Sequence, residues 1–222
     1  MYPPAVIFDF DGVIVDTEPI HYQAFQQILA PLGLGYSWEA YQETYMGYDD
    51  RDAFREAYSA AGQRIDDSYL QAIIQQKAEL FDTIISNGVT PYPGVINLIK
   101  DLAKSNIPMA ICSGALKSDI IPILQQLDII EYFTSIITAE DVVQSKPHPA
   151  SYLYAKAALI NCFHHLNTMS NQIAAIEDTP AGIASAKGAD LRVIAVTNSY
   201  AADKLVQADR IVATLEELVG SW

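Results

Sequence analysis

Short runs of apolar residues recur along the chain and alternate with longer stretches of helical periodicity. Each run is too short for a helix and is rich in Ile or Val, which is typical of strands buried on both faces of a parallel sheet. The six runs are residues 5–10, 108–112, 135–138, 173–176, 193–196 and 211–213. Helical patterns lie between them, for example at residues 94–105, 116–127 and 149–159. This alternation predicts a doubly wound, Rossmann-like α/β fold with a parallel sheet.

One interval interrupts the alternation. Between about residues 18 and 87 we find no convincing strand, only helical patterns at residues 20–31, 38–45, 51–61 and 66–86. We therefore expect a second, all-helical domain, the helical insert (residues 18–87). The α/β domain then consists of residues 1–17 and 88–222. The segment at residues 87–94, which returns to the α/β domain, is rich in turn-forming residues.

Composition narrows the class of protein. The 222 residues are 50% hydrophobic and 18% charged, which excludes intrinsic disorder. The 13 basic and 27 acidic residues give a formal net charge of -14, so we expect no nucleic-acid partner. This charge also repels anionic metabolites at long range, so a phosphorylated ligand would need a cation and well-placed Lys or Arg side chains.

Targeting signals are not apparent in the sequence. The first residues have no basic region before an apolar run, and no apolar stretch approaches 18 residues. We expect a soluble cytoplasmic protein that binds no membrane and is a monomer or a weak homodimer. Cys112 and Cys162 fit no disulfide framework or metal spacing, and we expect two reduced, buried thiols.

Polar residues follow four of the predicted strands. In open α/β sheets, ligands bind beyond the carboxyl ends of the strands, so these residues are expected to meet at one edge. The four sets are Asp9-Phe10-Asp11-Gly12, Ser113-Gly114, Lys146-Pro147 and Glu177-Asp178.

The carboxylates of these sets suit a hard cation. Asp9, Asp11, Glu177 and Asp178 offer oxygen ligands of the kind that Mg²⁺ prefers. Asp9 and Asp11 would share a face if the first strand continued that far. An isolated Asp-x-Asp-Gly is also typical of a turn with a capping Asp. The coincidence of four polar sets at strand ends favours a functional site.

The remaining two sets are suited to binding phosphate. Ser113-Gly114 precedes a predicted helix, whose exposed N–H groups would bind an anion, although an ordinary helix cap has the same pattern. The ammonium of Lys146 would hold a phosphate or a nucleophile, although a loop lysine is usually solvated.

The order of the four sets resembles the four motifs of the haloacid dehalogenase superfamily of phosphotransferases, and the helical insert is similar to the branch with a helical cap. Within that branch the chain resembles the β-phosphoglucomutase and phosphatase-like group. The resemblance extends over nearly the whole chain. The segments that carry it are Asp-Thr-Glu-Pro-Ile-His at residues 16–21, Tyr-Pro-Gly-Val at 92–95, Ser-Lys-Pro-His-Pro at 145–149 and Ile-Glu-Asp-Thr-Pro-Ala-Gly at 176–182.

The resemblance implies catalytic roles. Asp9 would attack phosphorus and form an aspartyl phosphate, and Asp11 would act as general acid and base. The backbone carbonyl of Asp11 would bind Mg²⁺ with Asp9 and Asp178, and Glu177 would assist directly or through water.

It also implies substrate-binding residues. Ser113, Gly114 and Lys146 would hold the oxygens of the transferring phosphoryl group. In the helical insert, His21 and Lys77 match cap positions that bind substrate. Arg51 is a third candidate, one residue later than the mutase spacing. Each of the three could instead be an ordinary exposed side chain.

Three functions follow as hypotheses. The first is a Mg²⁺-dependent phosphatase that acts on a small phosphorylated metabolite, for which we expect a sugar phosphate. The second is a mutase of the β-phosphoglucomutase type, although Ser113-Gly114-Ala115-Leu116 differs from the mutase-type Ser-Ala-Ser segment. The third is a non-catalytic phosphoryl-binding protein on the same scaffold.

Overall fold

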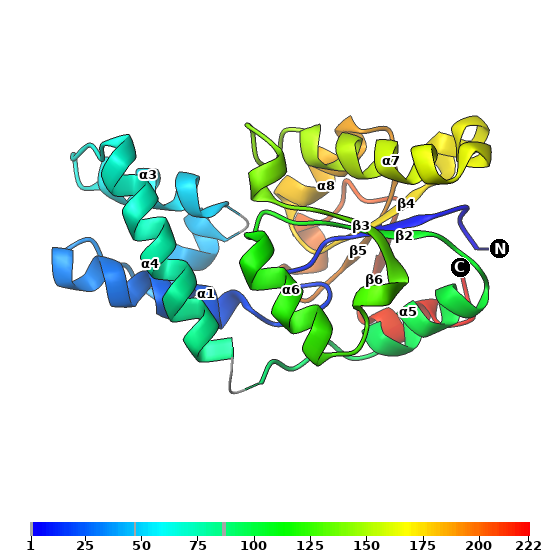
Figure 1. The fold of residues 1–222 in the computed structure, drawn as a ribbon, viewed down its shortest axis with the longest axis horizontal. Helices are drawn as coiled ribbons and strands as arrows, with labels where there is room; N and C mark the ends of the chain where they lie inside the picture. Colours follow the sequence, from blue (N-terminus) through cyan, green and yellow to red (C-terminus); the bar gives the residue numbers. More distant parts are fainter. Residues whose placement is uncertain (1, 47, 86–87) are drawn as a thin grey trace.

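A parallel sheet of six strands forms the core of the molecule (Figure 1). The computed structural model describes residues 2–46, 48–85 and 88–222. The strand order is β3-β2-β1-β4-β5-β6, and each apolar run of the sequence contributes one strand. The strands are β1 (Val6–Phe8), β2 (Met109–Cys112), β3 (Phe133–Ile137), β4 (Ala174–Glu177), β5 (Arg192–Val196) and β6 (Arg210–Val212). The predicted doubly wound α/β fold is thus confirmed.

Burial differs between the central and the edge strands. In β1, Val6 and Phe8 pack into the apolar cluster on one face of the sheet and Ile7 packs into the cluster on the other. This alternation requires apolar residues at every position of a central strand. The edge strands β3 and β6 are only partly buried, so the expectation of burial on both faces is wrong for them. Each has a neighbouring strand on one side only.

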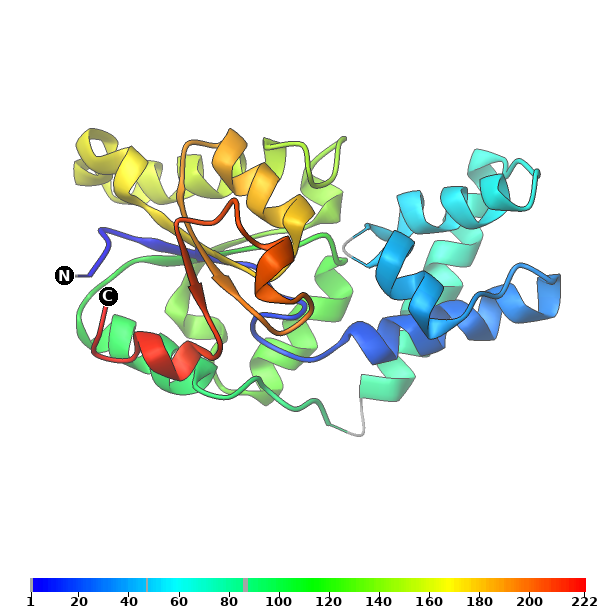
Figure 2. The same cartoon turned by 180° about the vertical axis from the view of Figure 1, so that it is seen from behind.

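Helices cover both faces of the sheet (Figure 2). One face packs against α5, α6 and η7, and the other against α7 and α8. The helices are α5 (Val95–Lys104), α6 (Lys117–Gln126), α7 (Ala150–Cys162) and α8 (Pro180–Gly188). Short 3-10 segments are η3 (Ile130–Tyr132), η4 (Ala139–Asp141), η5 (His164–Gln172), η6 (Ala202–Lys204) and η7 (Leu215–Leu218).

The helical insert lies between β1 and β2 in the chain. Its elements are α1 (Glu18–Leu29), η1 (Ala30–Leu32), α2 (Trp38–Ala40), the π-helical turn η2 (Tyr41–Tyr45), α3 (Asp50–Ala60) and α4 (Asp67–Ile85). They pack around a third apolar cluster that includes Phe25, Phe54 and Leu70. Residues 86 and 87, where we placed the end of the last helix and of the insert, lie outside the described part of the chain.

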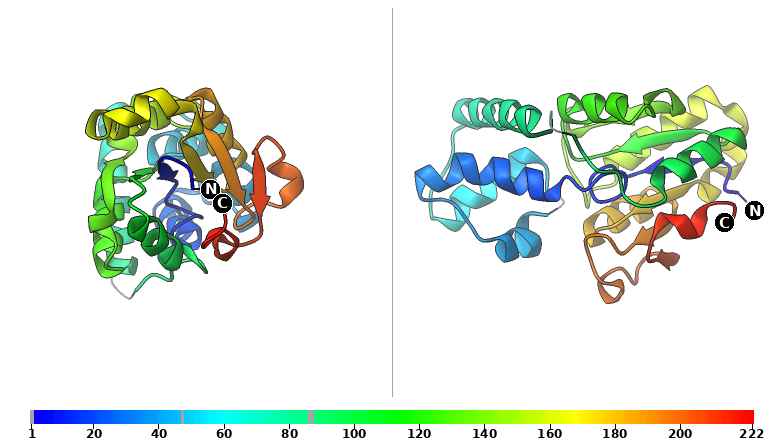
Figure 3. Two further views of the ribbon diagram at one scale, coloured as in Figure 1. Left: turned by 90° about the vertical axis from the view of Figure 1, so that its right-hand side faces the viewer. Right: turned by 90° about the horizontal axis from the view of Figure 1, so that it is seen from below.

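The carboxyl ends of the strands point toward the insert, and the two chain termini lie at the opposite end of the molecule (Figures 1 and 3). The two linkers between the domains pair with each other. Val15 and Pro91 form an antiparallel bridge, and the amide of Tyr92 donates to the carbonyl of Ile14 at 3.0 Å. The helical insert is therefore connected to the carboxyl ends of the strands by two linker segments that lie side by side.

Two further features concern expectations from composition. No helix in the described part of the chain is long and apolar enough to cross a membrane. Cys112 is buried in β2, but Cys162 is exposed, so the expectation of two buried thiols is wrong for Cys162. Cys162 is the last residue of α7.

Candidate active site

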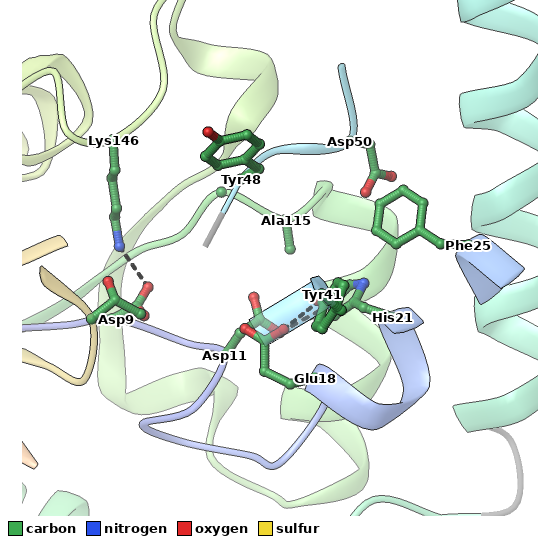
Figure 4. A pocket seen from close by; sticks show the side chains of 12 residues that line it. Asp9, Asp11, Glu18, His21, Phe25, Tyr41, Tyr48, Asp50, Ala115 and Lys146 are labelled. Carbon is green, nitrogen blue, oxygen red and sulfur yellow. Dashed lines mark hydrogen bonds and ion pairs between the residues drawn. The ribbon is translucent and has the colours of Figure 1, made fainter. Parts of the chain in front are cut away.

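A pocket opens between the carboxyl edge of the sheet and the helical insert (Figure 4). The sheet contributes acidic residues and a lysine, and the insert contributes aromatic and acidic residues. The residues that line it are Asp9, Asp11, Glu18, His21, Phe25, Tyr41, Tyr48, Asp50, Gly114, Ala115, Lys146 and Thr179. Three of the four predicted polar sets therefore contribute directly to one wall.

Lys146 forms the centre of an ion-pair network at the sheet end of the pocket. Its ammonium donates to Asp9 Oδ1 at 2.7 Å, to Glu177 Oε1 at 2.7 Å and to the carbonyl of Cys112 at 3.1 Å. Burial opposes the charge of Lys146, but Asp9 and Glu177 outweigh that effect and raise the pKa of Lys146 well above its usual value. Lys146 is thus a buried, permanently charged group, which excludes the solvated alternative.

Glu177 lies behind Lys146 with both carboxylate oxygens occupied. Tyr152 donates to Oε1 at 2.8 Å. Oε2 accepts from the amides of Asp178 and Thr179 at 3.1 and 3.4 Å and from the Thr179 hydroxyl at 3.3 Å. Because every oxygen has protein donors, Glu177 positions Lys146.

Asp9, Glu177 and Asp178 form a compact acidic cluster, with one oxygen of each within 4.8 Å of the others. Burial and the charge of Glu177 raise the pKa of Asp9, and burial and the charge of Asp9 raise that of Asp178. Asp178 Oδ2 accepts a hydrogen bond from Ser199, whereas its buried Oδ1 accepts none from the described part of the chain. An unpartnered buried carboxylate oxygen beside Asp9 fits a divalent cation.

Two glycines allow this cluster to form. A Cβ atom on Gly12 would lie 1.9 Å from Asp178 Oδ2, and Gly12 also has a φ of +78°. A Cβ atom on Gly182 would lie 2.0 Å from the carboxylate of Glu177. Neither position accepts a larger residue without displacing a carboxylate.

Asp11 lines the same pocket as Lys146. The chain leaves β1 at Phe8, so Asp9 and Asp11 do not share a strand face as the spacing suggested. Asp11 Oδ1 accepts from the Thr17 hydroxyl and contacts His21 Nε2 at 3.2 Å, and Oδ2 accepts from the Ser113 hydroxyl at 3.2 Å. Burial opposes ionisation of Asp11, but the contacts with His21 and Thr17 outweigh it and lower its pKa.

His21 connects Asp11 to a buried lysine. The ammonium of Lys77 lies 2.7 Å from His21 Nδ1. Since an ammonium only donates, Nδ1 accepts and Nε2 carries the hydrogen that faces Asp11. The imidazole also stacks on Phe81, with centroids 4.4 Å apart. His21 and Lys77 are both buried, so the exposed alternative is wrong for each.

Lys77 is not part of the pocket wall, contrary to our expectation of direct contact with substrate. Its ammonium lies behind the wall, 2.9 Å from Asp50 Oδ1 and 3.9 Å from Asp119 Oδ2. Asp50 belongs to α3 of the insert and Asp119 to α6 of the α/β domain. Lys77 therefore joins the two domains electrostatically.

Arg51 also differs from its predicted place in the substrate site. It lines a neighbouring cavity, and its guanidinium donates to Asp49 Oδ2 at 2.6 and 3.1 Å. It also donates to the carbonyls of Ala139 and Val142, at 3.3 and 3.4 Å. These bonds tie α3 to the α/β domain, a role that spacing from a motif cannot reveal.

Ser113 and Gly114 lie at the site, but not at a helix start. Helix α6 begins at Lys117, after a cap at Leu116 that has no side-chain hydrogen bond. The Ser113 hydroxyl instead accepts from the amide of Ala115 at 2.9 Å, in a turn that places Gly114 and Ala115 on the pocket wall. Ser113 therefore neither caps a helix nor stands at a helix N-terminus that could bind an anion, so both interpretations from the sequence are wrong.

Other site residues were missed in the sequence. Asn198 and Ser199 follow β5 and bond to the Gly12 carbonyl (2.7 Å) and to Asp178. They form a fifth polar set at a strand end, so the signal that identified the other four was present. Of the wall residues of the insert, His21 was a candidate and Glu18 lies in the quoted segment 16–21. Nothing in the sequence pattern distinguished Phe25, Tyr41, Tyr48 and Asp50.

Comparisons with known proteins give a consistent result. A family model described as haloacid dehalogenase-like hydrolase matches residues 6–196. The phosphorylated carbohydrates phosphatase of Thermotoga maritima is 25% identical over 97% of this chain and 99% of its own, and the β-phosphoglucomutase of Bacillus subtilis is 28% identical over 98% and 95%. The crystal structure of CbbY from Rhodobacter sphaeroides in complex with phosphate superposes with a TM-score of 0.84, at 24% identity, over 98% of this chain and 96% of that one. That likeness shows the fold.

Proposed function

Because the chain belongs to the haloacid dehalogenase-like hydrolases, we propose that it is a magnesium-dependent phosphatase that cleaves a small phosphomonoester, a sugar phosphate, through an aspartyl phosphate. The observation that carries the proposal is that Asp9, 2.7 Å from the ammonium of Lys146, lines one pocket together with Asp11. This arrangement supports Asp9 as the nucleophile, Lys146 as the fixed positive charge and Asp11 as the proton donor, because all three border a space beside the helical insert. The name of the relative from Thermotoga maritima supports the same activity.

The first step transfers the phosphoryl group to the protein. A carboxylate oxygen of Asp9 attacks phosphorus, an oxygen–phosphorus bond forms and the ester bond breaks. Asp11 gives its proton to the departing oxygen, so an alcohol leaves. Asp11 needs a proton for this step, and the negative phosphate that binds beside it raises the pKa of the carboxyl group.

The second step restores the protein. Asp11, now a carboxylate, takes a proton from a water molecule, whose oxygen attacks phosphorus while the bond to Asp9 breaks. Inorganic phosphate leaves, and Asp9 is again a carboxylate. Throughout, the ammonium of Lys146, held by Glu177, stabilises charge on the phosphoryl oxygens. The Ser113 hydroxyl, which donates to Asp11 in the free protein, turns its hydrogen toward these oxygens.

The acidic cluster supports Mg²⁺ as the cofactor. We assign Asp9, the unpartnered Oδ1 of Asp178 and the main-chain carbonyl of Asp11 as its ligands. When bound, Mg²⁺ neutralises charge between the nucleophile and the phosphate oxygens. Glu177 acts through Lys146, because its own oxygens are already occupied.

The test follows both reaction products. Purified protein is incubated with Mg²⁺ and a panel of sugar phosphates, and released phosphate and isomerised sugar phosphate are measured. We expect free phosphate as the main product, loss of turnover on addition of EDTA, and no turnover by Asp9→Asn. Asp203→Asn, which alters an exposed carboxylate, serves as the preparation control. Turnover retained by Asp9→Asn would contradict the proposal.

The alternative function is a phosphomutase, because one relative, 28% identical, is a β-phosphoglucomutase. A mutase uses the same aspartyl phosphate and transfers the group to a sugar hydroxyl in place of water. Conversion of β-glucose 1-phosphate to glucose 6-phosphate, primed by a bisphosphate and with little free phosphate, identifies this reaction.

A further inference from the structure

The described residues that line the pocket offer no unpaired positive charge. Within the described part of the chain, the basic residues that line the pocket are His21 and Lys146. Lys146 is occupied by Asp9 and Glu177, and His21 lies between Asp11 and Lys77. Both are therefore already paired within the protein.

Arg51 is a further candidate for binding a second anion, and its Nε and Nη2 already donate within the protein. Asp49, only 2% exposed, holds the guanidinium with two hydrogen bonds, and two main-chain carbonyls of the α/β domain hold Nη2. Arg51 does not line the pocket that contains Asp9 but a neighbouring cavity, which shares Asp50 with that pocket. Among the described residues, a second phosphate in the pocket of Asp9 would therefore meet no lining cation that is not already paired.

Asp50 instead offers an acceptor to the ligand. It is the first residue of α3 and lies on the pocket wall (Figure 4). Its Oδ1 is paired with the ammonium of Lys77 at 2.9 Å, whereas Oδ2 is buried and accepts no hydrogen bond from the described residues. A buried acceptor without a donor is unfavourable, and a ligand donor removes that penalty. Because Lys77 already neutralises the carboxylate, a neutral hydroxyl matches Oδ2 better than a cation does.

Aromatic rings complete this wall. Phe25, Tyr41 and Tyr48 line the pocket on the side of the insert, and the Tyr41 hydroxyl donates to Glu18. An apolar wall with a few placed acceptors suits the carbon skeleton and hydroxyls of a sugar or polyol. It opposes a carboxylate or phosphate, which would lie next to Asp50 and Glu18.

We infer that the leaving group of the substrate is an uncharged, hydroxyl-bearing moiety, that Asp50 Oδ2 binds one of its hydroxyls, and that a second phosphate or a carboxylate on the leaving group is rejected. This inference rests on the proposed phosphatase function. It makes Asp50 a specificity-determining residue and separates this chain from enzymes that bind a bisphosphate.

The test compares matched substrate pairs. Values of kcat/KM are measured for glycerol 3-phosphate against 3-phosphoglycerate and for fructose 6-phosphate against fructose 1,6-bisphosphate. We expect the neutral leaving group to be preferred by about tenfold or more in each pair. In Asp50→Asn, whose amide also donates hydrogen bonds, we expect the preference to narrow by about fivefold or more. Glu79→Gln alters an exposed carboxylate on α4, and we expect it to keep the wild-type ratio.

Acetyl phosphate, which has no hydroxyl to reach Asp50, reports the phosphoryl-transfer machinery separately. A folded Asp50→Asn protein that hydrolyses acetyl phosphate but keeps the wild-type ratios would overturn the assignment of Asp50. A preference of the wild type for the bisphosphate or the carboxylate overturns the inference while leaving the phosphatase proposal intact. Failure to hydrolyse acetyl phosphate and every ester would overturn the phosphatase proposal itself.

Discussion

Asp119 provides a test of the charged cluster between the two domains. Its carboxylate is fully buried. Ser118 donates to Oδ1, and no residue in the described part of the chain donates to Oδ2. Burial raises the pKa of Asp119 from its usual 3.8 to about 6. Asp50 adds to the rise, whereas Lys77 and, more weakly, His21 oppose it. The raised pKa means that the folded state binds this proton more tightly than the unfolded state does.

The magnitude follows from linkage. Each pKa unit corresponds to about 1.36 kcal/mol, so ionised Asp119 costs the folded protein about 3 kcal/mol relative to the protonated form. The favourable contribution of protonated Asp119 to folding is fully present below pH 3.8 and is lost as the pH rises through about 6. Because Asp119 lies in the first turn of α6, the helix dipole reduces the cost by about 0.3–1 kcal/mol.

We therefore expect Asp119→Asn, which imitates the protonated form, to be more stable than wild type by about 2–3 kcal/mol at pH 8. The advantage falls by about 1 kcal/mol at pH 5, where wild-type Asp119 is mostly protonated in the folded state. Urea unfolding of both proteins at the two pH values, followed by circular dichroism, measures the difference. Asp203→Asn, at an exposed position, is the control, and we expect its stability relative to wild type to be the same at pH 5 and pH 8. A stability difference that stays constant between pH 5 and 8 refutes the reasoning.

Two further substitutions test the acidic cluster and the network around Lys146. Gly12→Ala would place a methyl group on Asp178, so we expect Mg²⁺ affinity measured by calorimetry to fall by about tenfold or more. Gly33→Ala is the matched control, because Gly33 has a similar positive φ and no atom lies near the added Cβ. An equal loss of Mg²⁺ affinity in both variants would attribute the effect to backbone strain alone. Tyr152→Phe removes the hydroxyl that orients the glutamate behind the lysine, and we expect kcat to fall about fivefold to tenfold with KM unchanged. Tyr154→Phe, on an exposed position of the same helix, should keep full activity, and an unaltered kcat in Tyr152→Phe contradicts the positioning role.

The strands and the edge that carries the site follow from local pattern. A parallel strand buried on both faces requires a continuous apolar run, and the polar residues after it necessarily lie at the carboxyl edge. That rule placed Asp9, Asp178 and Lys146 near one another, and applied to β5 it also reaches Ser199. The partial burial of β3 and β6 was not predictable, because it depends on their place at the edges of the sheet. The order of strands in a sheet is set by long-range contacts and not by local sequence.

The parts of the site contributed by the helical insert could not be predicted in this way. Where Asp50 and Arg51 point depends on how α3 packs against the α/β domain: Asp50 lines the pocket of Asp9 and the neighbouring cavity, whereas Arg51 lines only the neighbouring cavity. Ser113 shows a local failure of the same kind, since three residues of turn separate it from the helix that its sequence seemed to begin. Charge and spacing give the residue types of a site, whereas packing decides which of them face the ligand.

The paired linkers have a consequence for how the chain folds. Val15 and Pro91 are bridged, so the 75 residues from 16 to 90 form a loop whose ends the α/β domain holds together. Closing a loop of this length costs about 4 kcal/mol of chain entropy. Assembly of β1, β2 and their neighbours fixes both ends, and the helices between them then fold as a tethered loop that no longer bears this cost. The α/β domain therefore acts as an entropic template for the helical insert, and loss of the linker pairing would weaken the insert even if each of its own contacts were kept.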